Sequence, residues 1–545
     1  MGRDVAAQCR VLDRNTEASS SPTIEEAQRF TEEARQPRMT MENWIGQASL
    51  PAEALQGGKG MKELSAIISK ASSDSRDPRA STPTITNGKL TLDEQLMVGG
   101  KHQTPWWNGR VRYPAIARAT YALTRYVPGM EGKGTTDRID SVIVEMNRDN
   151  SLVFSQNYGL WYDRRRDDHE RIRRRDGDVW APFYEQPFAR SGESKAWDGL
   201  SKYDLTKLNK WYYARLNEYA EKAAPEGKLL WNEHYFQHNI LEAGAHWVDC
   251  PWRTANNINH TDFPEPVPFT GDKRIFMAEY FYDISHPVRR ELHKQYIMQT
   301  LDALKDKPNV IHSIGEEFTG PLHFVQFWLD VVAEWEQTRG QKALIALAVN
   351  KDVQDAILQD PVRSKVVDII GIAQWYYHQK GLYAPEGGVN MAPRQYARKI
   401  KAGGVRFEDV YRSVREYRDA FPEKAVVYYA KSYPEMAWAA LMAGGSCPAV
   451  RISNTQLLAD LPLMHPTSAT NSDAGVYVLQ NDQVGALIYA EGGNKQVSLQ
   501  LPAGKYHLSA VDRKSGGVTS EKGTLNINGT FTTTVSGILW VQKMK

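Results

Sequence analysis

The sequence predicts an α/β protein, a (β/α)8 TIM-like barrel followed by a small antiparallel β-sandwich. Two observations lead to this prediction. Between about residues 120 and 452, short apolar runs alternate with amphipathic segments of helical period, which is the pattern of repeated βα units. From about residue 470 the hydrophobic period changes to two, in short runs separated by Gly, Asn and Asp turns, as in antiparallel sandwiches.

Three segments divide the chain of 545 residues. Residues 1–90 are polar and rich in turn residues, and we expect a connector or the tail of an upstream domain there. Residues 91–465 carry the barrel pattern, and residues 466–545 carry the sandwich pattern. The last segment has few aromatic residues, which favours a sandwich that braces the barrel over one that binds sugar.

Eight apolar runs are the expected barrel strands. Amphipathic segments between them, such as 321–340 and 406–421, have apolar residues at the i, i+3, i+4 and i+7 spacing of a helix. An open doubly wound sheet is the alternative, but no glycine-rich phosphate loop follows an early strand. The expected strands are residues 121–127, 151–156, 228–236, 309–317, 343–349, 366–377, 425–430 and 448–452.

Composition and charge exclude several classes of partner. Lys and Arg number 67 against 65 Asp and Glu, so the formal charge of +2 gives no reason to expect a nucleic acid. No run approaches the roughly 20 apolar residues that span a bilayer, and we expect no membrane span. Three widely spaced cysteines form neither a disulfide framework nor a metal motif, and we expect no cofactor.

Aromatic residues are the excess in this composition. The chain has 15 Trp and 26 Tyr, and nine of the Trp lie between Trp106 and Trp252. Indole rings pack in cores, and beside polar neighbours they also offer flat faces to sugar rings. The stacking candidates are Trp106, Trp107, Trp161, Trp247 and Trp252.

The end of the fourth expected strand carries the main catalytic candidate. Barrel active sites lie at the C-terminal ends of the strands, and side chains alternate along a strand, so one of Glu316 and Glu317 faces the barrel axis. The small residues Ser313 and Gly315 share a face with Glu317, which favours Glu317. A carboxylic acid there can protonate a leaving oxygen. The alternative is an acidic residue near the start of the next helix.

A second carboxylate is needed for glycoside hydrolysis. Glu386 and Glu435 are available near the sixth and seventh strand ends. Glu386 lies in a Gly-flanked loop, which can approach a ligand closely. Glu435 follows Pro434, a context that also suits the first turn of a helix. The sequence leaves open which of the two acts as nucleophile or general base.

Polar and aromatic residues at the other strand ends are expected to line a pocket. His234 and His238 stand four apart and could share a metal on a helix, but the segment has the pattern of a strand and a loop, so hydrogen-bonding roles are favoured and no metal is expected. The segment 163–178 interleaves seven Arg with five Asp and one Glu, which forms a salt-bridge network or supplies Arg164 to a sugar carboxylate. The expected pocket residues are Asn157, Tyr158, Trp161, Arg164, Glu233, His234, His238 and Trp375.

Two resemblances follow from these motifs. Gly315-Glu316-Glu317 resembles the donor motif of the retaining (β/α)8 glycoside hydrolases, whose proton donor follows the fourth strand and whose nucleophile follows the seventh. Here Glu316 stands where that clan usually has Asn, and no Glu ends the seventh strand. The runs 157–174, 182–192, 235–247 and 319–330 resemble a little-characterised bacterial family of polysaccharide-degrading glycoside hydrolases, over about residues 95–545. That resemblance implies the architecture and a periplasmic or extracellular location.

We therefore predict a glycoside hydrolase acting on a plant or microbial polysaccharide or oligosaccharide by carboxylate acid/base catalysis. The Arg and His residues near the rim favour an acidic, uronate-containing sugar. Two alternatives stay open. A polysaccharide lyase would use Tyr162 or His234 as base and Arg164 to neutralise a uronate, and a glycan-binding protein would keep the aromatic residues without turnover.

Overall fold

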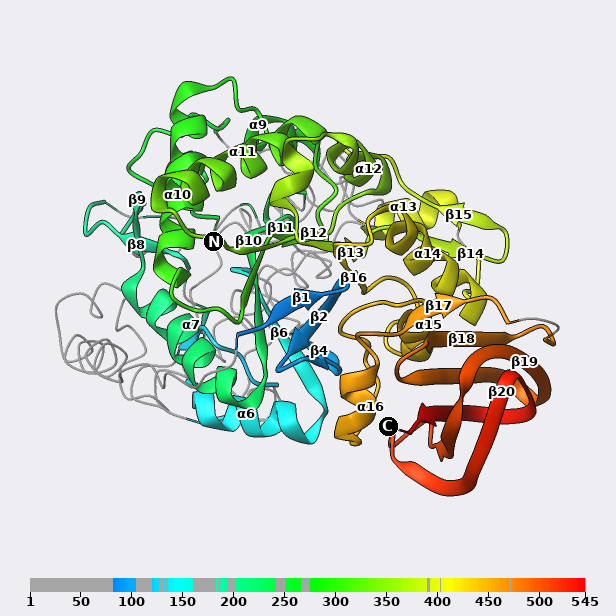
Figure 1. Cartoon of the computed structure of the whole chain (residues 1–545). Helices are drawn as coiled ribbons and strands as arrows, with labels where there is room; N and C mark the ends of the chain where they lie inside the picture. The colour runs from blue at the N-terminus through cyan, green and yellow to red at the C-terminus, as the bar shows by residue number, and fades with distance from the viewer. Residues whose placement is uncertain are drawn as a thin grey trace, which may run out of the picture.

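The computed structural model describes residues 82–544 apart from several internal segments, of which 104–119 and 160–182 are the longest. Its largest sheet has seven parallel strands that curve around a common axis, with helices on the outside (Figure 1). This arrangement is the predicted α/β barrel. In spatial order the strands are β4 (Gly100–Gln103), β6 (Ser151–Gln156), β10 (Leu229–Phe236), β11 (Val310–Glu316), β12 (Leu344–Leu347), β13 (Ile369–Ile372) and β16 (Ala425–Tyr428).

Residues 446–450 join the two edges of this sheet. Ser446 forms a parallel bridge with Val427 of β16, and the Gly99 amide donates to the Pro448 carbonyl at 2.9 Å, just before β4. The eighth strand was expected at 448–452, but these residues form no strand. The contacts at Ser446 and Pro448 bridge the two edges of the seven-stranded sheet only at single points.

The first barrel strand was predicted wrongly. The described residues of this range, 121–126, contain only β5 (Arg125–Tyr126), which pairs with β7 (Phe183–Tyr184) outside the barrel. The first barrel strand is β4, whose sequence is Gly-Lys-His-Gln. It gives no apolar signal because Lys101 faces a polar cavity inside the barrel.

A small antiparallel sheet closes the N-terminal end of the barrel. It consists of β1 (Thr84–Thr86), β2 (Lys89–Leu92) and β3 (Gln95–Leu96). Leu90 packs in one buried cluster with Leu229, Ile311 and Ile369 of the barrel wall. Residues 84–90, which were expected in an N-terminal connector, therefore form part of the barrel floor. The polar cavity lies at the opposite end of the barrel.

Helices cover the outside of the barrel (Figure 1). The two predicted amphipathic segments form α11 and α14, and α14 buries Val410, Val414 and Tyr417 at helical spacing. None of the described helices is long and apolar enough to cross a bilayer. The helices are α6 (Ile139–Arg148), α7 (Lys210–Ala223), α8 (His238–Leu241), α9 (Ile275–Phe281), α10 (Pro287–Leu304), α11 (Leu322–Arg339), α12 (Lys351–Gln359), α13 (Pro393–Ile400), α14 (Phe407–Ala420), α15 (Ala437–Met442) and α16 (Thr455–Asp460).

The C-terminal unit is the predicted antiparallel β structure, with strands β17 (His465–Thr467), β18 (Val476–Asn481), β19 (Gly485–Val511) and β20 (Val518–Lys543). The end of β20 pairs with both halves of β19, since Trp540 lies opposite Leu487 and Ser509. The sheet therefore folds over on itself around a separate apolar core. Tyr489 stacks on Phe407 of α14 at 4.5 Å, so aromatic side chains of this unit brace the barrel.

Candidate active site

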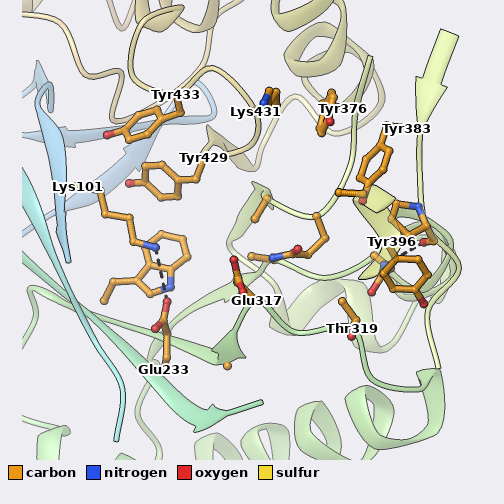
Figure 2. Close-up of a pocket in the computed structure, with 18 of the residues that line it drawn as sticks. Lys101, Glu233, Glu317, Thr319, Tyr376, Tyr383, Tyr396, Tyr429, Lys431 and Tyr433 are labelled. Atoms are coloured by element: carbon orange, nitrogen blue, oxygen red, sulfur yellow. Dashed lines mark hydrogen bonds and ion pairs between the residues drawn. The ribbon is translucent and has the colours of Figure 1, made fainter. Parts of the chain in front are cut away.

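A cavity of about 620 Å³ lies at the C-terminal ends of the barrel strands (Figure 2). This is the end at which (β/α)8 barrels carry their active sites. The polar and aromatic residues that line it are Lys101, Trp231, Glu233, Glu317, Thr319, Asn350, Gln374, Tyr376, Tyr383, Tyr396, Tyr429, Lys431 and Tyr433.

Strand alternation selects the side chains that enter the cavity. Trp231 and Glu233 line it from β10, and Gly315 and Glu317 line it from the end of β11. The intervening residue His234 points the other way, into the layer between sheet and helices, where its Nε2 lies 3.0 Å from His312 Nδ1. The predicted inward position of Glu317 is the one that the structure has.

Glu317 is held at the rim of the cavity. It is the first residue after β11 and has a left-handed backbone, with φ of 46°, a conformation that costs a non-glycine residue some strain. Its side chain is 41% exposed, and its Oε2 lies 2.5 Å from His238 Nε2. The Gln237 side chain donates to the Glu317 carbonyl at 2.8 Å and to Thr319 Oγ1 at 2.7 Å. The turn that positions the carboxylate is therefore fixed from α8 and its preceding loop.

Glu233 has a different environment, deep in the barrel wall. Its side chain is only 3% exposed. Ser155 Oγ donates to Oε1 at 3.0 Å, and Asn157 Nδ2 donates to Oε2 at 3.2 Å. Lys101 Nζ lies 3.7 Å from Oε1 (Figure 2). Two hydrogen-bond donors and a nearby ammonium group around one buried carboxylate stabilise its charged form.

Tyrosine rings form two walls of the cavity. On one side, Lys101 Nζ lies 5.1 Å from the centre of the Tyr429 ring, and Tyr429 packs edge-on against Tyr433 at 5.0 Å. On the other side, Tyr376 and Tyr383 stack at 4.8 Å. Burial, with smaller contributions from Tyr376 and Glu317, raises the pKa of Tyr383 to about 12, so its hydroxyl is neutral at pH 7. Figure 2 shows Glu317 between the two walls.

The two carboxylates predicted to partner Glu317 lie elsewhere. Glu386 and Glu435 are both exposed, and neither belongs to the described lining of the cavity. The Glu386 carbonyl accepts a hydrogen bond from Tyr396, which fixes the loop while leaving the carboxylate outside. Glu435 lies in the turn before α15. Of the residues lining the described cavity, only Glu233 and Glu317 are carboxylic acids.

Several predicted pocket residues are core residues instead. Tyr158 packs edge-on against Tyr296, and Trp375 is fully buried against Tyr417. His234 accepts from Trp328 Nε1 at 3.1 Å, and burial lowers the pKa of His234 well below its usual value. His234 follows the inward-facing Glu233 on β10, so alternation along the strand turns it toward the helices.

The other predicted residues divide between the site, the core and the segments outside the description. Glu233 lines the cavity, Asn157 contacts Glu233, and His238 contacts Glu317. Trp247 and Trp252 are fully buried in the core. The residues that lie outside the described part of the chain are Trp106, Trp107, Trp161, Tyr162 and Arg164.

The family model for DUF6298, a domain of unknown function, matches residues 1–464. The chain belongs to this family. In this DUF6298 protein the match ends one residue before β17, so it covers the barrel and not the C-terminal sheet. A search of the curated proteins found no match.

The solved structures similar to the DUF6298 chain are distant in sequence. A structure named glycoside hydrolase is 11% identical, with a TM-score of 0.45, and the match covers 85% of this chain and 97% of the other. A glycoside hydrolase family 5 protein from Bacteroides vulgatus ATCC 8482 is 11% identical, with a TM-score of 0.47 and coverage of 85% and 94%. A family 5 mannosidase from Rhizomucor miehei is 12% identical, with a TM-score of 0.34 and coverage of 64% and 72%. Similarity at this level does not identify a reaction.

Sequence reasoning missed several residues of the DUF6298 cavity. Lys101 lies in a short polar strand that no hydrophobic pattern marks, and only its contact with Glu233 identifies it. Tyr429 and Lys431 follow the seventh strand directly, and this position is itself a usable signal. Tyr383 belongs to the hairpin of β14 (Tyr376–His378) and β15 (Gly381–Tyr383), which only the tertiary structure places at the cavity.

Proposed function

We propose that this DUF6298 protein is a glycoside hydrolase in which Glu317 is the general acid. One observation carries the proposal. A partly exposed carboxylic acid stands directly after the fourth barrel strand, in a cavity with tyrosine walls and a second carboxylate. Hydrolysis of a glycosidic bond requires two carboxylic acids that face the same bound sugar.

The geometry supports a proton-donor role for Glu317. Its exposure allows the carboxyl to exchange protons with water between turnovers, and the turn held by Gln237 fixes its direction. Protonation of the glycosidic oxygen by Glu317 would make the leaving group a neutral alcohol. His238, 2.5 Å from the carboxylate, restricts its rotation. The chain's own carboxylates supply this chemistry.

We propose a polysaccharide or oligosaccharide of plant or microbial origin as the substrate. The stacked rings of Tyr376 and Tyr383 offer an apolar face of the kind that sugar rings pack against. Lys431 stands at the end of the seventh strand with its exposed side chain at the cavity, so a uronate carboxylate is the charged group that it would accept. Such substrates are met in the periplasm or outside the cell, and we propose that location.

A product screen tests the proposed function. Wild type and the Glu317→Gln variant are incubated with neutral and uronate-containing oligosaccharides, and new reducing ends and ultraviolet absorbance are both recorded. We expect saturated sugars from the wild type and loss of roughly 10²- to 10⁴-fold in rate for Glu317→Gln. Glu386→Gln, an exposed carboxylate outside the cavity, is the matched control and should keep full activity.

Two results would contradict this proposal. An unsaturated product absorbing in the ultraviolet would assign the protein to the lyases. Binding of oligosaccharides without release of any product, equal in wild type and Glu317→Gln, would assign it to the glycan-binding proteins.

A further inference from the structure

The second carboxylate of the cavity comes from an unexpected strand. In the glycosidase clan that the sequence resembles, the carboxylate opposite the acid follows the seventh strand. Here Tyr429 and Lys431 follow that strand, and the other carboxylate is on the third strand. We infer that Glu233 is the second catalytic carboxylate and acts in its charged form, opposite Glu317. This inference rests on the proposed glycosidase function.

Position is the first argument for Glu233. β10 and β11 are adjacent parallel strands, in which Glu233 pairs with Ser313 and Tyr235 with Gly315. Glu317 follows four residues after Ser313, so the two carboxylates enter one cavity from adjacent strands, with Glu233 further from the strand ends and Glu317 at the rim. In Figure 2 both carboxylates are directed into the same space, below Tyr429 and Lys431. A sugar bound there would lie against both.

Electrostatic environment is the second argument. Glu233 accepts two hydrogen bonds and lies near a lysine, while it is almost entirely shielded from water. Glu317 is partly exposed, and His238 lies 2.5 Å from its carboxylate. A carboxylate whose surroundings favour its charged form suits the role of base or nucleophile. A carboxylate that can exchange protons with water suits the role of acid. This division assigns the negative charge to Glu233.

The chemical step can be written without any further reactant than water. Glu317 gives its proton to the glycosidic oxygen as the bond from that oxygen to the anomeric carbon breaks. The Glu233 carboxylate either bonds to the anomeric carbon and is later displaced by a water that gives its proton to the Glu317 carboxylate, or takes the proton of a water whose oxygen bonds there. Retention or inversion of the anomeric configuration distinguishes the two, and both require the charge on Glu233.

A purely structural role for Glu233 makes a different prediction. A carboxylate that only compensates Lys101 would affect folding and would leave the kinetics of the folded variant unchanged. Kinetic measurements on folded Glu233 variants therefore separate the two roles. Thermal unfolding of each variant shows which preparations are folded.

The experiment uses 4-nitrophenyl and 2,4-dinitrophenyl glycosides of neutral sugars and uronic acids, with the whole chain. The variants are Glu233→Gln, which preserves the side-chain shape, and Glu233→Ala, which leaves space for a small anion. Glu317→Gln is the reference for loss of the acid, and Glu435→Gln is the matched exposed control. We expect kcat to fall about 10³-fold for Glu233→Gln with both leaving groups. The defect of Glu317→Gln should shrink with dinitrophenol, because that leaving group needs little protonation.

Azide provides a second readout. With Glu233→Ala, azide should restore turnover and give a glycosyl azide of configuration opposite to the substrate, since azide occupies the face that Glu233 leaves. The new bond joins azide nitrogen to the anomeric carbon as the bond to the leaving oxygen breaks. If Glu233→Ala does not fold, Glu233→Ser replaces it in this arm.

The outcomes are distinct. A folded Glu233→Gln protein with kcat within tenfold of wild type overturns the inference and leaves the glycosidase proposal intact. Failure of azide to rescue the folded small variant also overturns it. If the wild type hydrolyses neither these glycosides nor the oligosaccharides of the product screen, the glycosidase proposal fails, and the role of Glu233 fails with it.

Discussion

Replacing Lys101 with Met tests whether Glu233 is charged in the folded protein. Lys101 and Glu233 are 11% and 3% exposed, and Lys101 Nζ lies 3.7 Å from Glu233 Oε1. Two unit charges at that distance attract by about 4.5 kcal/mol at an effective dielectric constant of about 20. Hydrogen bonds from Ser155 and Asn157 remain in the variant, so we expect a loss of about 3 kcal/mol in the free energy of unfolding at pH 7.

The assay is urea unfolding followed by tryptophan fluorescence, at several pH values. Without Lys101, protonation of Glu233 relieves its uncompensated charge, so the deficit should be largest at neutral pH and should shrink as the pH falls. The double variant Lys101→Met, Glu233→Gln removes both charges, and most of the stability should return.

A surface ion pair is the matched control. Lys294 Nζ lies 2.7 Å from Glu334 Oε1, closer than the buried pair, but both side chains are well exposed. Lys294→Met should therefore change the free energy of unfolding by at most about 1 kcal/mol. If Lys101→Met is no more destabilising than Lys294→Met at pH 7, Glu233 is not a charged buried group and the reasoning is refuted.

Three further predictions concern other parts of the molecule. His238→Asn removes the ring beside the Glu317 carboxylate, and we expect kcat to fall about tenfold with KM unchanged; unchanged kcat would show that the contact does not position the acid. Tyr383→Ala removes one ring of the Tyr376 stack, and KM should rise about fivefold with kcat retained; steady-state kinetics check both variants, and a fall in kcat alone would contradict a binding role. Burial lowers the pKa of His293 from 6.5 to about 3, so the stability that it contributes is present above pH 6.5 and is lost as the pH falls toward 3. In the His293→Gln variant, the free energy of unfolding should fall less steeply with decreasing pH, by about 1.4 kcal/mol per pH unit in that window. Urea unfolding measures this slope, and an unchanged slope would contradict the prediction.

Local periodicity in the sequence determined much of the fold. The second to seventh strands, the helices α11 and α14 and the C-terminal antiparallel unit lie where the apolar spacing placed them. The reason is that each of these elements buries one face, and burial of one face leaves a period in the sequence. Alternation along this strand selected Glu317 as the carboxylate that enters the cavity, although Glu317 lies just past the end of β11 in a left-handed turn.

Only the tertiary structure decided the composition of the site. β4 has no apolar period because its inward side chain, Lys101, meets a carboxylate two strands away. Residues 446–450 bridge the two edges of the sheet through contacts with Val427 and Gly99, which are far from each other in the chain. Glu386 is near a strand end in sequence but is exposed and outside the cavity. Sequence spacing reports which face of an element is buried, whereas the neighbours across a barrel depend on strand order and register, which spacing within one element does not contain.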